Sequence, residues 1–365
     1  MTDNGDTSDA FRRPDGPGEP PTDRPSTPAT SPASARRGGP HPQVAEASAT
    51  AQRVLDEVER AVVGKRDALG LVLAAILAKG HVLLEDLPGL GKTLAARSFA
   101  RALGLDFTRA QFTPDLLPAD LTGSFLYDQR DRTFEFRKGP LFTGLLLADE
   151  VNRTPPKTQS ALLEAMQERQ VTVEGETFPL PEPFHVLATA NPIEYEGTYP
   201  LPEAQLDRFL LRVRFGYPSG EEEYDVIARR LERQREEVDL DQVTDAGGLR
   251  ALQAAVETVT VDASVGRYCV DLVAATRSHS DVLTGASPRG SLGLVLAARG
   301  FAVLRGRDYV IPEDVKAVAR SVLAHRITVR PELWMTDASG SRVVDQVLAS
   351  VATPATLERS AAGRS

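Results

Sequence analysis

The sequence predicts an α/β fold in which a parallel sheet flanked by helices is followed by an all-helical domain. Between residues 81 and 215, apolar runs of strand length alternate with helix-forming segments. A strand, a glycine-rich turn and a helix follow one another directly at 81–102, and the hydrophobic spacing becomes helical after Pro218. Such alternation of strands and helices indicates a parallel sheet with helices on both of its faces.

Two helices are predicted ahead of the first strand. The first covers residues 44–63, where apolar side chains recur every three or four positions. A break at Gly64-Lys65 separates it from the second, at 67–79.

The strands of the sheet are predicted at 81–85, 107–111, 145–149, 184–190 and 209–215. Two pairs of shorter segments interrupt them. Segments 123–127 and 133–136 are predicted to form one hairpin, and segments 170–173 and 177–180 a second one around Gly175.

The C-terminal helices are predicted at 221–237, 246–256, 263–278, 287–304 and 312–325. The last of these begins with Pro312 followed by two acidic residues, Glu313 and Asp314. Proline and acidic side chains are both favoured in the first turn of a helix. We therefore expect an α/β core to be followed by a separate helical domain.

Composition limits the class of protein. The chain has 365 residues, 41% hydrophobic and 25% charged, which is typical of a soluble globular protein of two or three domains. The net charge of −9, without a run dense in Lys and Arg, argues against a surface for duplex DNA. No apolar run reaches membrane-spanning length and the N-terminus lacks an apolar signal core, so we expect a cytoplasmic protein.

The only cysteine of the chain, Cys269, excludes an internal disulfide and a cysteine-rich zinc site. We expect it to be a small buried residue on a helix.

The amino-acid composition of the two ends of the chain differs from that of the rest. Residues 1–43 contain nine prolines and one aromatic residue, Phe11. Such a segment buries too little apolar surface to offset its ordering entropy, so we expect a disordered Pro-rich tail. A partner-binding or phosphorylated tail is the alternative. The predicted domains are then the α/β core at 44–217, the helical domain at 218–353 and a C-terminal tail at 354–365.

The turn at 86–94 has the features of a phosphate-binding loop. Its glycines let backbone N–H groups surround an anion, and the helix that follows points its positive end at the same place. Lys92 can reach the β- and γ-phosphates, and the Thr93 hydroxyl can bind Mg²⁺. Asp86 stands where the consensus has its first glycine. The candidate nucleotide-binding residues here are Pro88, Gly89, Leu90, Gly91, Lys92, Thr93 and Leu94.

A second candidate site follows the buried strand at 145–149. Asp149 and Glu150 come at its carboxyl end, the edge at which open α/β sheets bind ligands. Asp149 can bind Mg²⁺ opposite Thr93, and Glu150 can take a proton from an attacking water. Two solvated acids at the end of a strand are the simpler alternative.

Three further polar residues are candidates for the same chemistry. Asn191 ends another apolar strand and could orient the attacking water, although an Asn-Pro turn would look the same. Arg208, between a helix and a strand, could reach the γ-phosphate of a neighbouring subunit, or could pair with Asp207 or Glu203. Arg289 opens a helix of the second domain and could close onto the phosphate, or could be a plain surface residue.

Taken together, these motifs resemble the MoxR-type AAA+ ATPases. The resemblance covers about residues 44–335. It is carried by the segments 83–93, 148–157, 159–168, 190–209 and 285–289, whose sequences are LLEDLPGLGKT, ADEVNRTPPK, QSALLEAMQE, ANPIEYEGTYPLPEAQLDRF and GASPR. The resemblance implies an AAA+ P-loop NTPase core followed by a helical lid domain.

The resemblance also implies roles for the candidate residues. Lys92 and Thr93 would belong to the Walker A motif, and Asp149 and Glu150 to Walker B. Asn191 would be sensor 1, Arg208 the arginine finger and Arg289 sensor 2. Val63 and Gly64 would line the adenine pocket. The first predicted hairpin would be the helix-2 insert and the second the pre-sensor-1 hairpin.

The function implied by the resemblance is ATP hydrolysis with Mg²⁺ in an oligomeric ring, usually hexameric, that remodels or matures partner proteins. Partners in this family often carry von Willebrand factor A domains, and some members assist metal insertion. A magnesium-chelatase-type motor subunit is the nearest alternative. A DNA-acting AAA+ motor and a scaffold that binds ATP without useful turnover are more distant ones.

Overall fold

The structure is a computed structural model that describes residues 41–191, 198–333 and 339–355. All described elements belong to the unit Pro40–Ser365. Residues 1–40 of the predicted N-terminal tail and 356–365 of the predicted C-terminal tail lie outside the described residues, and so does the part of the 190–209 motif at 192–197. The last two residues of the predicted N-terminal tail, Pro42 and Gln43, belong to the first helix instead.

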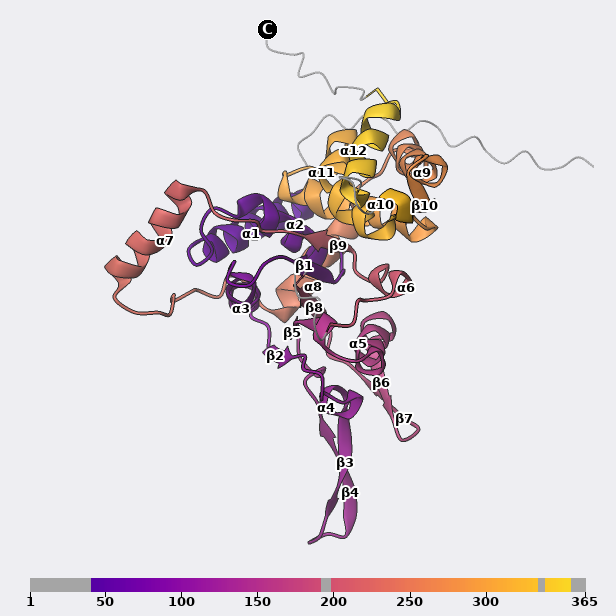
Figure 1. The fold of residues 1–365 in the computed structure, drawn as a ribbon. Coiled ribbons are helices and arrows are strands. Elements are labelled where there is room, and N and C mark those ends of the chain that lie inside the picture. The colour runs from indigo at the N-terminus through magenta and orange to yellow at the C-terminus, as the bar shows by residue number, and fades with distance from the viewer. Residues whose placement is uncertain (1–40, 192–197, 334–338, 356–365) are drawn as a thin grey trace, which may run out of the picture. The chain divides into compact units, whose positions relative to one another are not determined.

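A five-stranded parallel sheet forms the centre of the core, as predicted (Figure 1). The order of its strands is β2-β5-β8-β1-β9, and every neighbouring pair is parallel. The strands are β1 (Val82–Glu85), β2 (Phe107–Gln111), β5 (Leu145–Asp149), β8 (His185–Ala190) and β9 (Leu211–Val213).

Strand β9 is shorter than the predicted 209–215. The chain leaves the sheet after Val213 because the next N–H groups, those of Phe215 and Gly216, donate to the Asp86 carboxylate instead of to a strand. Gly216 has a φ of +65°, which turns the backbone away.

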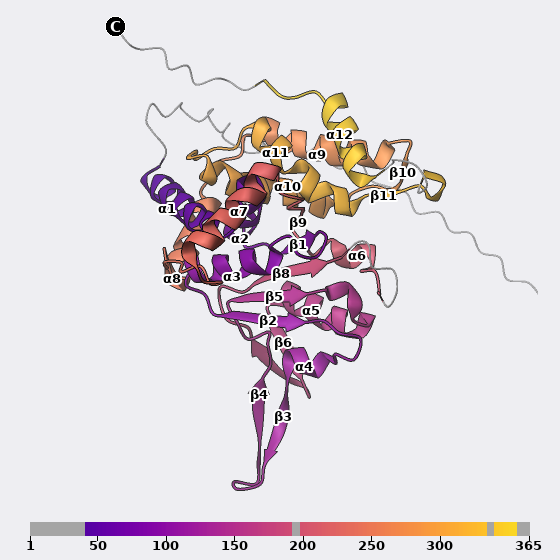
Figure 2. The same cartoon turned by 60° about the vertical axis from the view of Figure 1, so that its left-hand side comes forward.

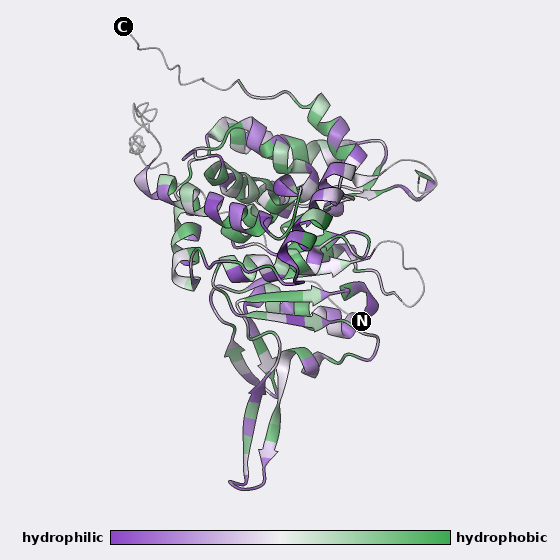
Figure 3. Ribbon diagram, turned by 90° about the vertical axis from the view of Figure 1, so that its left-hand side faces the viewer, coloured by the Kyte–Doolittle hydropathy of each residue, from purple (hydrophilic) through white to green (hydrophobic). Residues whose placement is uncertain are grey.

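Alternate residues of the inner strands β1, β5 and β8 enter different hydrophobic clusters on the two faces of the sheet, as expected for a sheet that is covered on both sides. On β1, Leu84 lies in one cluster and Leu83 in the other; on β5, Leu147 and Leu146 divide in the same way. Figure 3 shows these strands as predominantly hydrophobic.

Helices α1 (Pro42–Glu59), α2 (Arg66–Leu77) and α3 (Lys92–Ala102) contribute to the first cluster. The shorter α4 (Pro118–Thr122) and the longer α5 (Pro156–Glu168) contribute to the second. Two single-turn elements, η1 (Val151–Arg153) and α6 (Glu203–Leu206), complete the core. The first helix ends four residues before its predicted end, because the chain turns at 60–63 ahead of Gly64, whose φ is +70°.

Both predicted hairpins are present. The first joins β3 (Gly123–Asp128) to β4 (Thr133–Lys138), and the second joins β6 (Gln170–Val173) to β7 (Glu176–Pro179). The hairpins meet through aromatic rings, since Phe178 stacks on Phe136 with ring centroids 4.0 Å apart. Beyond this contact the β3–β4 hairpin extends away from the sheet (Figures 1 and 2).

The C-terminal part is helical, as predicted. Its helices are α7 (Gly220–Arg233), α8 (Ala246–Glu257), α9 (Ala263–Ser278), α10 (Pro288–Leu304), α11 (Pro312–Leu323) and α12 (Gly340–Ser350), with single turns η2 (Ala324–Arg326) and η3 (Pro331–Leu333). An antiparallel pair, β10 (Val282–Thr284) and β11 (Thr328–Val329), was not predicted. Helix α7 stops at Arg233, short of 237, because Gln234 takes a left-handed conformation.

Helices α8 to α12 share one hydrophobic cluster with α1, α2 and α3. Helix α10 lies close against α2 at Gly300, where a Cβ atom would lie 2.4 Å from the carbonyl oxygen of Ala74. Cys269 on α9 is 1% exposed, which confirms the expectation of a buried helical cysteine. Within the described ranges, none of the helices has the length and apolar character needed to cross a membrane.

Candidate functional site

The carboxyl ends of β1, β8, β5 and β2 meet at one edge of the sheet and surround a cavity of about 410 Å³. Because these four strands are parallel neighbours, the polar residues that follow them converge there. The cavity is lined by Pro88, Gly89, Leu90, Gly91, Lys92, Thr93, Leu94, Arg109, Asp149, Glu150, Thr189, Ala190 and Asn191.

The loop after β1 adopts the shape expected of a phosphate-binding loop. Gly89 and Gly91 both have a φ of +81°, a region that other L residues rarely occupy. A Cβ atom at either position would meet only open space, so it is the backbone conformation that requires glycine. Gly91 is also the N-cap of α3, whose first N–H groups therefore face the cavity.

Lys92 lies across the start of this loop. Its Nζ donates to the carbonyl oxygens of Asp86 and Leu87, each at 2.6 Å. Burial lowers the pKa of Lys92, and the nearby Asp86, Asp149 and Glu150 oppose that shift. The ammonium group is thus held among acceptors at the mouth of the loop, where an anion with several oxygens would compete for it.

Asp149 is 7% exposed and is held from two sides. The Thr189 hydroxyl donates to its Oδ1 at 2.6 Å. Arg109 of β2 donates to its Oδ2 through Nε at 2.9 Å and through Nη2 at 2.6 Å. The carboxylate is therefore fixed in one orientation.

Glu150 has an unusual backbone, with a φ of +59°. Its N–H donates to Oγ1 of Thr189 at 2.8 Å, which fixes this left-handed turn to β8. Its carboxylate oxygen Oε2 accepts from Gln111 Nε2 at 2.7 Å and from Arg153 Nη1 at 3.1 Å. Glu150 thus lines the cavity with its side chain held by two neighbouring donors.

Asn191 follows β8 and is 9% exposed. Its carbonyl oxygen accepts from Nδ2 of Asn152 at 3.1 Å, which ties the end of β8 to the turn after β5. The residue lies in the wall of the cavity, together with Glu150.

The donor set suits a magnesium ion. Mg²⁺ prefers oxygen ligands, and the Thr93 hydroxyl and the Asp149 carboxylate both line the cavity. Oδ2 of Asp149 accepts from Arg109 and Oδ1 accepts from Thr189, so a cation that bound this carboxylate would compete with one of these donors.

Asp86, at the place of the first consensus glycine, has a structural role. Its Oδ2 accepts from the N–H groups of Phe215 at 2.6 Å and Gly216 at 2.8 Å, and its Oδ1 accepts from Leu87 N at 3.2 Å. The phosphate-binding loop is therefore bonded to the segment that leads from β9 into α7.

A second cavity, of about 490 Å³, adjoins that segment. Gly64 lines it together with Lys65, Phe215, Glu222 and others. Val63, the other residue expected at the adenine, is half-buried and does not line it. Asp86 contacts Phe215, so this cavity is linked to the phosphate-binding loop by a hydrogen bond.

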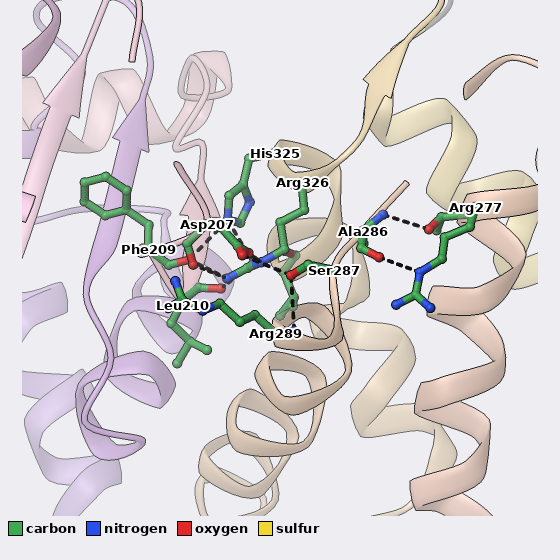
Figure 4. Close-up of polar contacts among 11 residues, drawn as sticks. Asp207, Phe209, Leu210, Arg277, Ala286, Ser287, Arg289, His325 and Arg326 are labelled. Carbon is green, nitrogen blue, oxygen red and sulfur yellow. Dashed lines mark hydrogen bonds and ion pairs between the residues drawn. The ribbon is translucent and has the colours of Figure 1, made fainter. Parts of the chain in front are cut away.

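Arg208 and Arg289 do not line the 410 Å³ cavity. Arg208 lies between α6 and β9, and Arg289 is exposed in the first turn of α10. Figure 4 shows that the segments carrying them meet, since the Ser287 hydroxyl donates to Asp207 Oδ2 at 3.0 Å. The alternative pairing of Arg208 with Asp207 is not formed, because the Asp207 carboxylate binds Ser287 and Arg326.

Polar residues of the site that were not predicted include Arg109, Gln111, Arg153 and Thr189. Arg109 and Gln111 lie two positions apart on β2 and therefore point to the same side. This spacing of polar residues near the end of a strand was visible in the sequence. The hydrogen-bond partners of Arg109 and Gln111, which are Asp149 and Glu150, could not be read from the sequence, because these contacts depend on β2 lying beside β5.

Known proteins resemble the chain over most of its length. Residues 81–211 match the family described as ATPase family associated with various cellular activities (AAA), and residues 274–347 match the AAA lid domain. The uncharacterized protein YeaC of Bacillus subtilis is 49% identical over 310 residues, which cover 85% of this chain and 96% of that protein. The chaperone MoxR1 of Mycobacterium tuberculosis is 46% identical over 314 residues, covering 84% and 82%.

A solved structure agrees with these relatives. The crystal structure of a protein from Cytophaga hutchinsonii, described as a candidate ATPase, has a TM-score of 0.80 and 41% sequence identity. The match covers 86% of this chain and 97% of the chain in that structure. With the phosphate-binding loop, the acidic pair and the helical lid in place, the chain belongs to the MoxR-type AAA+ ATPases.

Proposed function

We propose that this protein hydrolyses ATP, with Mg²⁺, in the 410 Å³ cavity. The observation that carries the proposal is that the phosphate-binding loop, the Asp149–Glu150 pair and Asn191 line this one cavity. These residue types supply an anion cradle, a metal ligand, a proton acceptor and a group that orients water.

In this proposal the loop N–H groups and Lys92 bind the phosphates, and the N-terminal end of α3 adds its positive potential. Thr93 and Asp149 hold Mg²⁺, which when bound would neutralise charge on the phosphate oxygens. Val63 and Gly64 contact the adenine; the 490 Å³ cavity, which Gly64 lines, supports this for Gly64, and Val63 is placed there by the resemblance.

Glu150 is the general base. A water oxygen attacks the γ-phosphorus, the bond to the β–γ bridging oxygen breaks, and the water proton passes to Glu150, giving ADP and phosphate. Asn191 orients the water. Gln111 and Arg153 both donate to Oε2 of Glu150, which leaves Oε1 as the oxygen to accept the proton.

The protein works as a homo-oligomer, a ring that is hexameric by resemblance. The position of Arg208 and Arg289 outside the cavity supports this, since both cations would then act on ATP held by a neighbouring subunit. The client is a protein, and a von Willebrand factor A-domain protein is the partner class that the resemblance implies. ATP turnover would remodel or mature it in the cytoplasm, with metal-cofactor insertion as one form of that work and no nucleic acid as substrate.

A phosphate-release assay tests the reaction. Lys92→Ala should abolish nucleotide binding, whereas Glu150→Gln should bind ATP and assemble normally but lose at least about 10²-fold in kcat. Glu164→Gln, which neutralises an exposed acid on α5, is the matched control and should behave as the parent chain. Normal hydrolysis by Glu150→Gln would refute the assignment of the base.

Mixing subunits tests action across an interface. Arg208→Ala should form rings that bind ATP and turn it over slowly. Adding Lys92→Ala subunits, which keep Arg208, should restore part of the rate if Arg208 serves a neighbour's site. Absence of rescue in rings shown to be mixed would argue against action between subunits.

A further inference from the structure

Arg326 is a deeply buried cation that joins the lid to the core. Its side chain is 4% exposed and belongs to η2, directly after α11. Nε donates to Oδ1 of Asp207 at 2.6 Å, and Nη2 donates to the carbonyl oxygens of Asp207 at 3.3 Å and Phe209 at 2.7 Å. Nη1 donates to the carbonyl oxygens of Leu210, at 3.3 Å, and Val322. Figure 4 shows the guanidinium between these acceptors.

These contacts fix the chain on both sides of Arg208. The residue before it is held through its carboxylate and carbonyl oxygen, and the two residues after it through their carbonyl oxygens. The Leu210 N–H also donates to His81 O at 2.9 Å, which attaches the segment to the start of β1. Within the described residues, the Arg208 side chain itself makes no hydrogen bond or ion pair, so its backbone is fixed while its guanidinium stays available.

The same aspartate holds the segment that carries Arg289. The Ser287 hydroxyl donates to Asp207 Oδ2 at 3.0 Å and accepts from the Arg289 N–H at 3.2 Å. Ser287 is the N-cap of α10, so Asp207 is bonded to the start of the helix that presents Arg289. Arg208 and Arg289 are therefore carried by segments that share one buried anchor.

The charges around Arg326 favour a lasting ion pair with Asp207. Burial lowers the pKa of Arg326, Asp207 opposes this shift, and Arg289 adds to it. A guanidinium stays charged in a protein even so. Removing one partner would leave an uncompensated charge in the interior, which makes the pair hard to open.

We propose that Arg326 is a positioning residue for ATP hydrolysis: through Asp207 and Ser287 it holds Arg208 and Arg289 in one fixed arrangement toward the γ-phosphate bound by a neighbouring subunit. The inference rests on the proposed function. Only arginine can fill the position, because a lysine offers three donors on one nitrogen and cannot reach acceptors arranged around a planar fork.

Steady-state ATPase kinetics of Arg326→Lys and Asp207→Asn test the proposal. Both should lower kcat by about 10²-fold, the scale of a misplacement near 1 Å, while the KM for ATP and the oligomeric state stay at the parent values. Arg307→Lys is the matched control, since Arg307 forms a bidentate ion pair with Asp314, also in the lid but away from Arg208. It should lower the melting temperature and leave kcat within about twofold of the parent value.

A double-mutant comparison separates positioning from general damage. In an Arg208→Ala, Arg289→Ala background, adding Arg326→Lys should change kcat by less than about twofold, because the groups it positions are already gone. A further loss as large as in the parent chain would overturn the proposal, and so would a normal kcat in soluble, folded Arg326→Lys.

If Arg326→Lys does not fold, Ser287→Ala still tests the proposal, because it removes the hydroxyl that links Asp207 to the Arg289 N–H and leaves the Arg326–Asp207 ion pair in place. It should lower kcat severalfold without aggregation, and an unchanged kcat would count against the shared anchor. If the parent chain releases no phosphate at all, the proposed function fails. If the parent chain is active but the variants at Arg326, Asp207 and Ser287 keep a normal kcat, only the inference about Arg326 fails and the proposed function stands.

Discussion

Asp86, in the phosphate-binding loop, accepts a hydrogen bond from the backbone N–H of Gly216, 130 positions later in the chain. The same carboxylate oxygen binds the Phe215 N–H, and the Asp86 carbonyl oxygen binds Lys92 Nζ. One residue thus contacts both the lysine expected to bind phosphate and the segment leading to α7. The consensus of the loop has its first glycine at this position. In this chain the position holds Asp86, which joins the loop to the segment that leads to α7.

Asp86→Gly should therefore loosen that junction although it restores the consensus. Hydrogen bonds to a charged acceptor contribute about 1.5–3 kcal/mol each, so the melting temperature should fall by several degrees. Amide hydrogen exchange of a peptide covering 214–218 should become faster. Asp271→Ala, on the exposed side of α9, is the control, and equal exchange in both variants would contradict the junction.

Arg109→Met should tighten the apparent affinity for Mg²⁺. Arg109 donates to Oδ2 of Asp149 and would compete with a metal for this carboxylate, and Thr189 still holds Oδ1 after the change. Titrating ATPase activity with Mg²⁺ at fixed ATP should give a half-saturating concentration severalfold lower than in the parent chain. A higher value would mean that Arg109 orients Asp149 for the metal more than it competes.

Acid should destabilise the fold through its buried histidines. Burial lowers the pKa of His81 to about 3 and that of His185 to about 4, and it lowers that of His325 well below its usual value. Each is neutral when folded but takes up a proton near pH 6.5 when unfolded. Their contribution is therefore complete above about pH 6.5 and is lost as the pH falls, by about 1.4 kcal/mol per unit for each histidine.

Urea unfolding between pH 7.5 and 5 measures this loss. His185→Gln, which can still contact Gly80 and Gln253, should reduce the slope of stability against pH by one histidine's share. His41→Gln changes an exposed residue directly before α1 and should leave the slope of stability against pH unchanged. Identical slopes in all three proteins would rule out the buried histidines as the cause.

Phe136→Ala should detach the β3–β4 hairpin from the rest of the core. Phe136 stacks on Phe178 and also contacts Phe125 and Phe142. Its loss removes the stacked contact between the two hairpins and, among the described residues, leaves only the tilted Phe125–Phe178 pair, whose ring centroids are 6.2 Å apart. Limited proteolysis should then cut within 123–138 sooner. Phe134→Ala is the matched control because Phe134 is 70% exposed and near the tip; similar cleavage of both would contradict the role of the stacked ring.

Local patterns allowed most of the fold to be predicted. Five strands, both hairpins and the phosphate-binding loop depend on neighbouring residues, such as the apolar run before Asp149 and the glycines at 89 and 91. Helix ends were less accurate, since the left-handed turn at Gln234 has no glycine or proline to mark it.

Only those features of the site that depend on residues close together in the sequence could be predicted. Lys92, Thr93, Asp149, Glu150 and Asn191 follow strands that could be recognised one at a time. The pairing of Arg109 with Asp149 depends on the order of the strands, which the sequence does not display. The anchor formed by Arg326 depends on how the lid folds back on the segment at 207–210, over a separation of 119 positions.

The burial of Cys269 has a practical consequence for labelling the protein. Its surroundings raise the pKa of the thiol to about 12, so near neutral pH almost none of it is the reactive thiolate. It is also the only cysteine in the chain. A cysteine introduced at Phe134 or Leu292 would thus be the one that a maleimide dye labels. Fluorescence could then follow the hairpin or the lid through an ATP cycle without first removing a native thiol.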